Sequence, residues 1–443
     1  MDVELSGHYN LRRIAQAAVP CIVMMLVTSV YSIVDGIFIS NFVGTQAFAS
    51  INLIWPPIMM LGALGLMIGT GGSALVSKTM GEGDSATANK IFSMLVHFTL
   101  IMGILLAVLF AVFVRPISLM LGAEGDMVGE CVLYGRICIT ALPMFMLGMA
   151  FQSFYMTAGK PHLGTWMSIV SGVINIILDA LFVVVLQWGV AGTAIATSTA
   201  QIVGGVFPLI YFHSRRNNSS LRLEHTPFVW RHIGKSCLNG MSEYVGNVAM
   251  NVACICYNLQ LMHYLGQDGV AAFGVLMYVG FIFSAMFIGY NIGVAPVIGF
   301  NYGAQNHSEL HSLLKKSMVI LIVAGCVLML VSELTSSLLA SIFVSYDPQL
   351  HALTTHAIRL YMISFMLCGV NMFVSALFTA LNNGMVSAVA AFARTMIFEI
   401  ASIFVLPLFL GVDGIWLAVD VAEVFALILS VVLILAFRKR YQY

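Results

Sequence analysis

Hydrophobic residues run through this chain in long stretches, which are broken by glycine, proline and charged residues. A stretch of roughly 20 apolar residues is long enough to cross a bilayer as an α-helix, and twelve such stretches occur here. The six in the first half are 14–43, 51–79, 91–114, 130–157, 163–186 and 190–213. The six in the second half are 235–265, 273–301, 314–336, 354–380, 385–410 and 412–437. The pattern therefore predicts an all-α polytopic membrane protein with twelve transmembrane helices.

A polar stretch and an internal repeat divide the chain in two. Residues 214–234 form the longest polar stretch, a predicted linker between an N-terminal six-helix bundle, 1–213, and a C-terminal one, 235–443. One constant offset aligns these bundles without gaps: it places Gly44 on Gly266 and Gly189 on Gly411. Each bundle has an even number of predicted spans, so both enter the membrane from the same side and the repeat is parallel. Two such bundles around a central cleft favour a secondary transporter that works by alternating access.

Composition excludes several other classes of protein. Hydrophobic residues make up 60% of the chain and charged residues 9%, whereas soluble domains carry about 25% charged residues. The 19 Lys and Arg balance the 19 Asp and Glu, so the basic excess of a nucleic-acid binder is absent. The sequence contains neither a Walker motif nor a His-Glu-x-x-His pair, and its eight cysteines lack zinc-ligand spacing. We therefore expect neither an enzyme nor a cofactor.

The positions of the cations predict an orientation in the membrane. Fifteen of the 19 Lys and Arg residues, Arg216 among them, lie on the side that holds the N-terminus. Arg115 alone lies on the opposite side, and the other three fall within predicted spans. Because cytoplasmic loops carry the excess of cations, both termini are predicted to be cytoplasmic, in a multi-pass protein of the cell membrane.

Polar residues inside the first bundle form the strongest candidate site. Asp35 lies in the outer part of the first span, and Asn175 and Asp179 lie one turn apart in the fifth. Thr197 lies at a matching depth in the sixth span. A charge inside the bilayer is costly, so an intramembrane carboxylate is a functional hypothesis by default. Four oxygen-bearing side chains at one depth predict a site for a proton or a hard cation; they are metal ligands only if the ion is Na⁺.

The second bundle carries its own acids, Glu243, Glu399 and Glu423, each within a predicted span. Two interpretations stay open for them: substrate or coupling acids, or partners of buried cations such as Arg394. Under the offset that relates the two bundles they do not copy Asp179. Glu399, Asp420 and Glu423 meet, in that order, Ile177, Ser198 and Gln201.

Several motifs resemble those of the multidrug and toxic compound extrusion (MATE) family, over nearly the whole chain. The resemblance is carried by Asp35 within Val-Asp-Gly-Ile-Phe-Ile and by Asn175 with Asp179. It is also carried by three glycine-containing segments, 189–197, 296–303 and 411–416.

This resemblance implies an outward-exporting antiporter of two bundles in a V shape, which exchanges H⁺ or Na⁺ for mostly cationic, amphipathic drugs. Asp35, Asn175, Asp179 and Thr197 then look like the cation site found in the N-terminal bundle of many members. Glu243 resembles the acid that some members carry in the seventh span. Two residues depart from the family: Ala295 stands where many members have Gln, and Glu399 is not general, so its role is not carried over.

The implied partners are small organic cations and the lipid bilayer, and we expect a monomer. The alternative is a lipid-linked oligosaccharide flippase of related architecture. A flippase needs clustered Arg or Lys residues in the cleft to hold a pyrophosphate, and the spans of the first half carry only Arg136.

Overall fold

The structure is a computed structural model that describes residues 3–215, 217–345 and 347–443, so Arg216 lies outside the described residues. It is built from helices, with π-helical turns at η1, η2 and η4 and a 3-10 turn at η3. The N-terminal half contains α1 (Leu11–Phe38), η1 (Ile39–Val43), α2 (Thr45–Gly81), α3 (Ser85–Met120), α4 (Asp126–Thr140), α5 (Leu142–Thr157), α6 (Pro161–Asp179), η2 (Ala180–Val185) and α7 (Gly189–His213).

The C-terminal half follows a linker and contains the remaining elements. These are α8 (Trp230–Leu265), α9 (Gln267–Gly303), α10 (His307–Val344), α11 (Pro348–Tyr361), η3 (Met362–Ser364), α12 (Phe365–Ala380), α13 (Gly384–Phe392), η4 (Ala393–Glu399), α14 (Ile400–Val405), α15 (Pro407–Leu410), α16 (Val412–Trp416) and α17 (Ala418–Tyr441).

The sequence repeat is also a repeat of local structure. The helices α9, α10 and α11 begin at the positions onto which the sequence offset carries the first residues of α2, α3 and α4. Asp84 caps α3 by accepting a hydrogen bond from the Thr87 backbone (2.9 Å), and Asn306, its counterpart in the repeat, caps α10 in the same way. Gly44 and Gly266 precede α2 and α9 with positive φ angles that favour glycine.

The helices account for the twelve predicted spans. Ten of the described helical segments are long and apolar enough to cross a membrane, and α4 with α5 forms an eleventh span bent by 59°. Pro143 lies in the first turn of α5, directly after this bend. The twelfth is α8, 36 residues long, which packs against α2 and α9. It is less apolar because Asn239, Glu243, Asn247 and Asn251 recur at four-residue intervals on one face. The predicted polytopic fold is confirmed.

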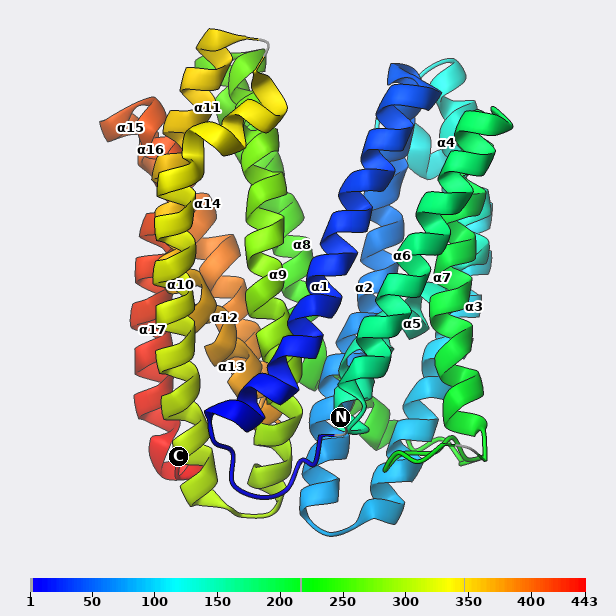
Figure 1. Ribbon diagram of the computed structural model, residues 1–443, viewed down its shortest axis with the longest axis vertical. Helices are drawn as coiled ribbons and strands as arrows, with labels where there is room; N and C mark the ends of the chain where they lie inside the picture. Colours follow the sequence, from blue (N-terminus) through cyan, green and yellow to red (C-terminus); the bar gives the residue numbers. More distant parts are fainter. Residues whose placement is uncertain (1–2, 216, 346) are drawn as a thin grey trace.

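The two halves meet at one end and separate toward the other (Figure 1). At the lower end of Figure 1, where both termini lie, α2 contacts α8 and α9 through glycines. A Cβ atom at Gly71 or Gly240 would collide with the backbone of the facing helix, and the same holds for Gly81 and Gly303. Small residues allow this close approach of helix backbones. These contacts close the molecule at the end that carries most of the cations.

Each half has its own packed interior and an apolar exterior. Phe92 and Phe154 pack edge to face in the N-terminal half (5.2 Å between ring centres), and Tyr257 stacks on Phe273 in the C-terminal half (4.7 Å). Large apolar side chains such as Leu334, 85% exposed, cover the outside of the helices. A surface of this kind is expected where lipid is the solvent.

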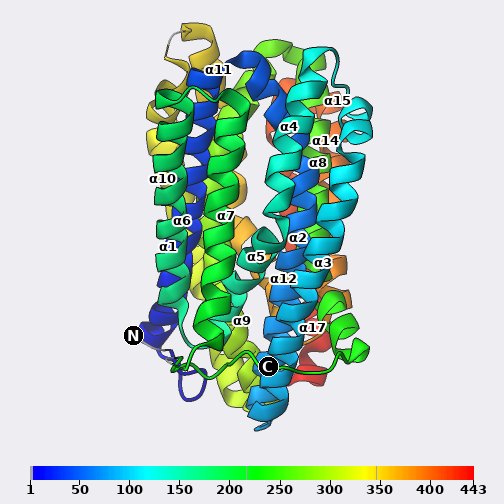
Figure 2. The ribbon, with the colours of Figure 1, turned by 90° about the vertical axis from the view of Figure 1, so that its right-hand side faces the viewer.

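Two extended segments cross the lower end of the molecule. The N-terminal segment bridges the halves: the Val3 backbone N–H donates to Gly159 O (2.9 Å), and the Tyr9 N–H donates to Glu309 Oε1 on α10 (2.8 Å). Burial raises the pKa of the Tyr9 hydroxyl, which therefore stays neutral. The linker after α7 runs across the base of the N-terminal half (Figure 2), where the Arg222 N–H donates to Asn89 Oδ1 (2.6 Å).

Candidate functional site

A cluster of polar side chains lies inside the N-terminal half, toward the end opposite the termini. Asp35 comes from α1, and Asn175 and Asp179 come from one face of α6. Gly172, one turn before Asn175, packs against the ring of Tyr31 and lets α6 approach α1 closely. The carboxyl group of Asp35 lies beside the side chains of Asn175 and Asp179, both of which are fully buried. The structure therefore brings together three of the four residues singled out from the sequence.

Several polar atoms of this cluster have no hydrogen-bond partner among the described residues. One oxygen of Asp35, both oxygens of Asp179 and both amide atoms of Asn175 are buried without a hydrogen bond among the described residues. The groups that act electrostatically on Asp35 and Asp179 in the described chain include no cationic side chain. A buried carboxylate without a partner is costly, so this set of acceptors suits a proton or a small cation.

Thr197 joins the cluster through a residue that sequence reasoning missed. Its hydroxyl oxygen, on α7, is buried and also lacks a partner among the described residues. Tyr134 of α4, 2% exposed, lies with its hydroxyl beside Thr197 and close to Asp35. Nothing in the sequence marks Tyr134, because it is an aromatic residue within an apolar stretch. Gln201, one turn after Thr197, adds a further buried oxygen without a partner in the part of the chain that the structure describes.

π-helical turns follow directly after both helical segments that carry the carboxylates. The turn η1 begins four residues after Asp35, and η2 begins at the residue after Asp179. A π-helical turn inserts an extra residue into the helix and changes the direction of the side chains around it, and such turns are frequent at functional sites. Here the two turns lie side by side, since η1 contacts η2.

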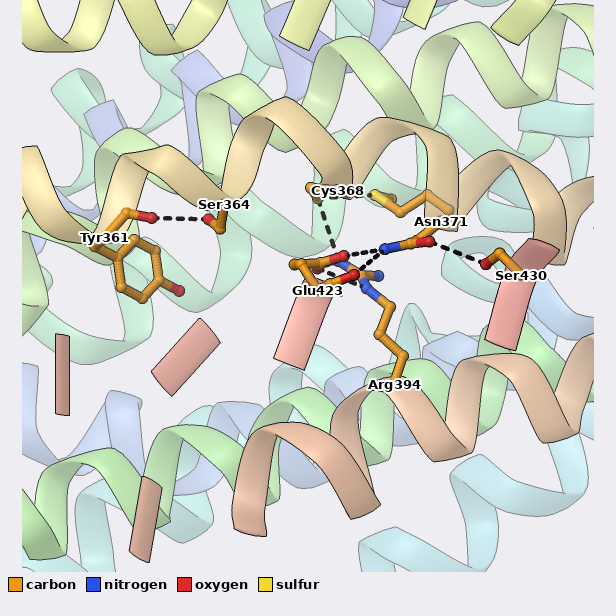
Figure 3. Close-up of polar contacts among 8 residues, drawn as sticks. Tyr361, Ser364, Cys368, Asn371, Arg394, Glu423 and Ser430 are labelled. Carbon is orange, nitrogen blue, oxygen red and sulfur yellow. Dashed lines mark hydrogen bonds and ion pairs between the residues drawn. The ribbon is translucent and has the colours of Figure 1, made fainter. Parts of the chain in front are cut away.

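The C-terminal half contains a polar network of a different kind, in which the charges are paired (Figure 3). Arg394 donates from Nε (2.7 Å) and Nη2 (2.5 Å) to Glu423 Oε1, and Glu423 is 2% exposed. Asn371 donates to the other carboxylate oxygen (2.6 Å), and Ser430 in turn donates to Asn371 Oδ1 (2.9 Å). Arg394 Nη2 also donates to the sulfur of Cys368 (3.2 Å).

The remaining acids predicted from the sequence lie apart from the N-terminal cluster. Glu423 is the partner of Arg394, whose side chain is 25% exposed, and such a pairing is one of the two interpretations left open above. Glu399 ends the π-helical turn η4 and faces Arg394 and Glu423. Glu243 lies on α8, one turn above Asn239, whose side chain contacts Gly71 of the other half. Glu243 is therefore close to the place where the halves separate.

Two parallel six-helix halves, with a buried acidic cluster in one of them, define a polytopic membrane protein built like a secondary transporter. A family model described as MatE matches this chain twice, at residues 20–181 and 244–405. The chain belongs to the MatE family, as its motifs predicted, and it is a multi-pass protein of the cell membrane. One match lies within each half of the fold.

Curated relatives align over almost the whole chain. The multidrug export protein MepA of Staphylococcus haemolyticus is 25% identical over 423 residues, which cover 96% of this chain and 93% of that protein. MepA of Staphylococcus saprophyticus is 23% identical over the same coverage.

Solved structures share the fold. A crystal structure of MATE in complex with MaL6 matches with a TM-score of 0.91 at 21% identity, over 99% of this chain and 97% of that one. An outward-facing conformation of a multidrug resistance MATE family transporter matches with a TM-score of 0.90 at 21% identity, over 97% and 95% of the two chains.

Proposed function

We propose that this protein exports amphipathic, mostly cationic drugs or toxic organic compounds in exchange for H⁺ or Na⁺. The names of the curated relatives, multidrug export proteins, support the substrate class. The observation that carries the coupling is the cluster of Asp35, Asn175 and Asp179, whose buried polar atoms lack hydrogen-bond partners among the described residues. Thr197 completes the proposed cation site. A site that is stable only with a bound positive charge can couple transport to an ion gradient, because its occupancy follows the ion concentration.

The proposed substrate path is the space between the two halves. Glu243 lies one turn beyond the contacts that α2 makes with α8 through Gly71 and Gly240. A carboxylate at that position attracts an organic cation. One chain contains both halves, so the proposed unit is the monomer.

The proposed cycle begins in the arrangement seen here, closed at the end of the termini. That end carries the cations and is taken as cytoplasmic. A proton or Na⁺ enters from outside and binds at Asp35 and Asp179, which compensates their charge and allows the surrounding helices to pack differently. The drug leaves outward, the halves then rock to open the cytoplasmic side, and the ion is released inward. One net inward charge per cycle at 100 mV supplies about 2.3 kcal/mol, enough for a gradient of several tens-fold.

The flippase alternative is disfavoured by the pairing of charges. A pyrophosphate needs free Arg or Lys donors in the cleft. Arg394, a cation within the helices of the second half, already binds Glu423 and Cys368.

The test is transport of ethidium, a fluorescent organic cation, in inside-out vesicles that contain the purified protein. A proton gradient and a sodium gradient are imposed separately, with wild type, Asp35→Asn and the control Glu124→Gln. Glu124 is an exposed acid of the same half, outside the cluster. We expect one gradient to drive ethidium movement in wild type and in Glu124→Gln but not in Asp35→Asn.

Two outcomes would contradict the proposal in different ways. Movement that persists in Asp35→Asn would remove this cluster from the coupling mechanism. No movement of ethidium under either gradient, with correctly inserted protein, would argue against export of organic cations and favour a narrower substrate or a flippase.

A further inference from the structure

The N-terminal segment, residues 3–9, is attached to both halves at the closed end of the molecule (Figure 1). It begins at Val3, beside the turn between α5 and α6, and leads into α1, which starts at Leu11. The glycine contacts of α2 with α8 and α9 close the same end. A segment that connects the halves here bears on how this end opens, because opening must separate the halves at this place.

The attachment to the C-terminal half is built from charged and buried groups. Glu309 of α10, whose side chain is 6% exposed, accepts hydrogen bonds from the Tyr9 backbone N–H (2.8 Å) and from His8 Nδ1 (2.7 Å). Lys316, two turns further along α10, donates from Nζ to the Tyr9 backbone oxygen (2.6 Å). The side chains of Leu5 and Tyr9 are buried in an apolar cluster made mostly of residues from the C-terminal half.

The first turns of α1 continue this attachment. Gly293 of α9 lies against the backbone of Ala17 and Ala18, and a Cβ atom at this glycine would lie 2.7 Å from the Ala17 oxygen. Such close approach of two helix backbones needs a small residue. From Leu5 to Ala18 the chain is thus held by the C-terminal half.

The attachment to the N-terminal half is a backbone contact. The Val3 N–H donates to Gly159 O (2.9 Å), in the turn between α5 and α6. Gly159 has a φ angle of +73°, and a Cβ atom there would lie 2.7 Å from the Val3 oxygen, so this contact requires glycine. A hydrogen bond between neutral backbone groups is weaker than the charge-assisted bonds that Glu309 accepts. Of the two attachments, the one at Gly159 is therefore the easier to break.

We propose that residues 3–9 are a latch: they hold the closed end together, stay on the C-terminal half, and part from the N-terminal half at Gly159 each time this end opens. The inference rests on the proposed function, because it takes the rocking of the halves from the transport cycle. By stabilising the closed end, the latch lowers the population of the arrangement that is open on the side of the termini. The rival account is that the segment only lies along the surface and has no effect on opening.

The experiment uses Cys237 as a native reporter of opening. Cys237 of α8 packs against the buried cluster of the N-terminal half that contains Phe92, so separation of the halves uncovers its thiol. Its rate of reaction with N-ethylmaleimide is measured by mass spectrometry on the full chain in proteoliposomes. Hydrogen exchange of the Tyr9 amide, measured on the same preparations, reports whether the segment stays on Glu309.

Two variants weaken the contact at Gly159 from its two sides, and each has a matched control. Gly159→Ala places a Cβ atom against the Val3 oxygen. Its control, Gly83→Ala, puts alanine at a similar positive φ angle (+88°) in the turn between α2 and α3, where the Cβ atom meets nothing within 4 Å. Val3→Pro removes the N–H that donates to Gly159, and its control, Val3→Ala, keeps it.

We expect Gly159→Ala and Val3→Pro each to raise the labelling rate of Cys237 by about fivefold, the effect of losing about one backbone hydrogen bond. Both controls should label at the rate of wild type. In all four variants we expect the Tyr9 amide to exchange as in wild type, because the segment stays on the C-terminal half.

The outcomes separate this inference from the proposed function. Unchanged labelling in either variant, or faster labelling in a control, would overturn the latch. Exchange of the Tyr9 amide that accelerates together with labelling of Cys237 would overturn release at Gly159, since the segment would then be leaving the C-terminal half. Neither readout depends on ethidium or on an ion gradient, so a failed latch leaves export standing. Absence of ethidium movement in wild type would overturn export without changing the result at Gly159.

Discussion

The two halves share one scaffold, but the acidic cluster of the N-terminal half and the Arg394–Glu423 network of the C-terminal half treat buried charge in opposite ways. In the N-terminal half, Asp35 and Asp179 lie together without a cationic neighbour among the described groups that act on them. In the C-terminal half, Glu423 holds Arg394 and accepts a hydrogen bond from Asn371. The first arrangement leaves hydrogen-bond acceptors that need a proton or a cation from outside the protein. In the second, the charged and polar groups pair with one another.

This difference suits one cluster to ion binding and the other to holding the fold together, although both lie in copies of the same repeat. A buried ion pair with complete hydrogen bonds holds helices in place, whereas uncompensated carboxyls are costly unless a ligand relieves them. The N-terminal half therefore has the chemistry of a site that must change during a cycle. The Arg394–Glu423 pair, which joins η4 to α17, has the chemistry of a fixed support.

The largest effect is expected from the N-terminal half. Asp179→Asn keeps the shape of the side chain but removes the charge that the cation would compensate. We expect cation-driven ethidium export to fall by roughly a hundredfold or more, with no loss of thermal stability. Initial rates in proteoliposomes and a thermal unfolding curve of the same preparation check this. Unchanged export, or a strong drop in stability, would remove the contrast between the halves.

The C-terminal half should respond in the opposite way. Arg394→Gln leaves the carboxylate of Glu423 buried without its cation, and we expect this to lower the free energy of unfolding by about 3–5 kcal/mol. The double variant Arg394→Gln with Glu423→Gln removes both charges, and it should recover most of that loss. Denaturation in detergent measures all three proteins. If the single variant is as stable as the double variant, the pair is not a structural support.

A smaller effect is expected where the halves touch. Gly240 of α8 contacts the backbone of Met67, so the added methyl group in Gly240→Ala forces α2 and α8 apart. We expect this to lower the free energy that favours the closed contact between the halves by about 1–3 kcal/mol. We expect Cys237, on the same helix, to react faster with a thiol reagent, as measured by mass spectrometry. Gly234→Ala, where the added Cβ meets nothing within 4 Å, is the matched control. Equal labelling of both variants would show that this contact does not hold the halves together.

The smallest effect is expected at the N-terminal segment that bridges the halves. Glu309→Gln weakens the bonds from the Tyr9 backbone and from His8 to Oε1 and Oε2 of Glu309 (2.8 and 2.7 Å). We expect the free energy of local opening of this segment to fall by about 1 kcal/mol, which would be measured as several-fold faster hydrogen exchange of the Tyr9 amide. Glu4→Gln, which changes an exposed acid of the same segment, should leave this exchange unchanged. Faster exchange in both variants would mean that Glu309 does not anchor the segment.

Much of the candidate site could be predicted from the sequence. Asn175 and Asp179 had to share a helical face because they are four residues apart, and an intramembrane Asp at position 35 was conspicuous in an apolar stretch. Tyr134 could not be found in this way. Its role depends on a bend between α4 and α5 and on packing against α7, and neither leaves a signal in hydropathy.

The acids of the second half could also be found in the sequence, but their partners could not. Glu399, Asp420 and Glu423 were visible as charges in apolar stretches, but the sequence left their partners open. Only the packing of η4 against α17 pairs Arg394 with Glu423, so that Glu399 shares this one cation and Asp420 has none among the described groups that act on it. Three residues of similar chemistry thus acquire different roles through contacts between segments distant in the chain.

By itself the sequence determined the membrane class, the number of spans, the parallel duplication and the uneven distribution of cations. Each of these depends on local composition or on a fixed displacement along the chain, so no knowledge of distant contacts was needed. The tertiary structure alone decided which buried charges are paired, where the halves touch, and which polar atoms are left without partners. These features depend on helix packing, in which residues hundreds of positions apart become neighbours and the energy of a charge is set by what surrounds it.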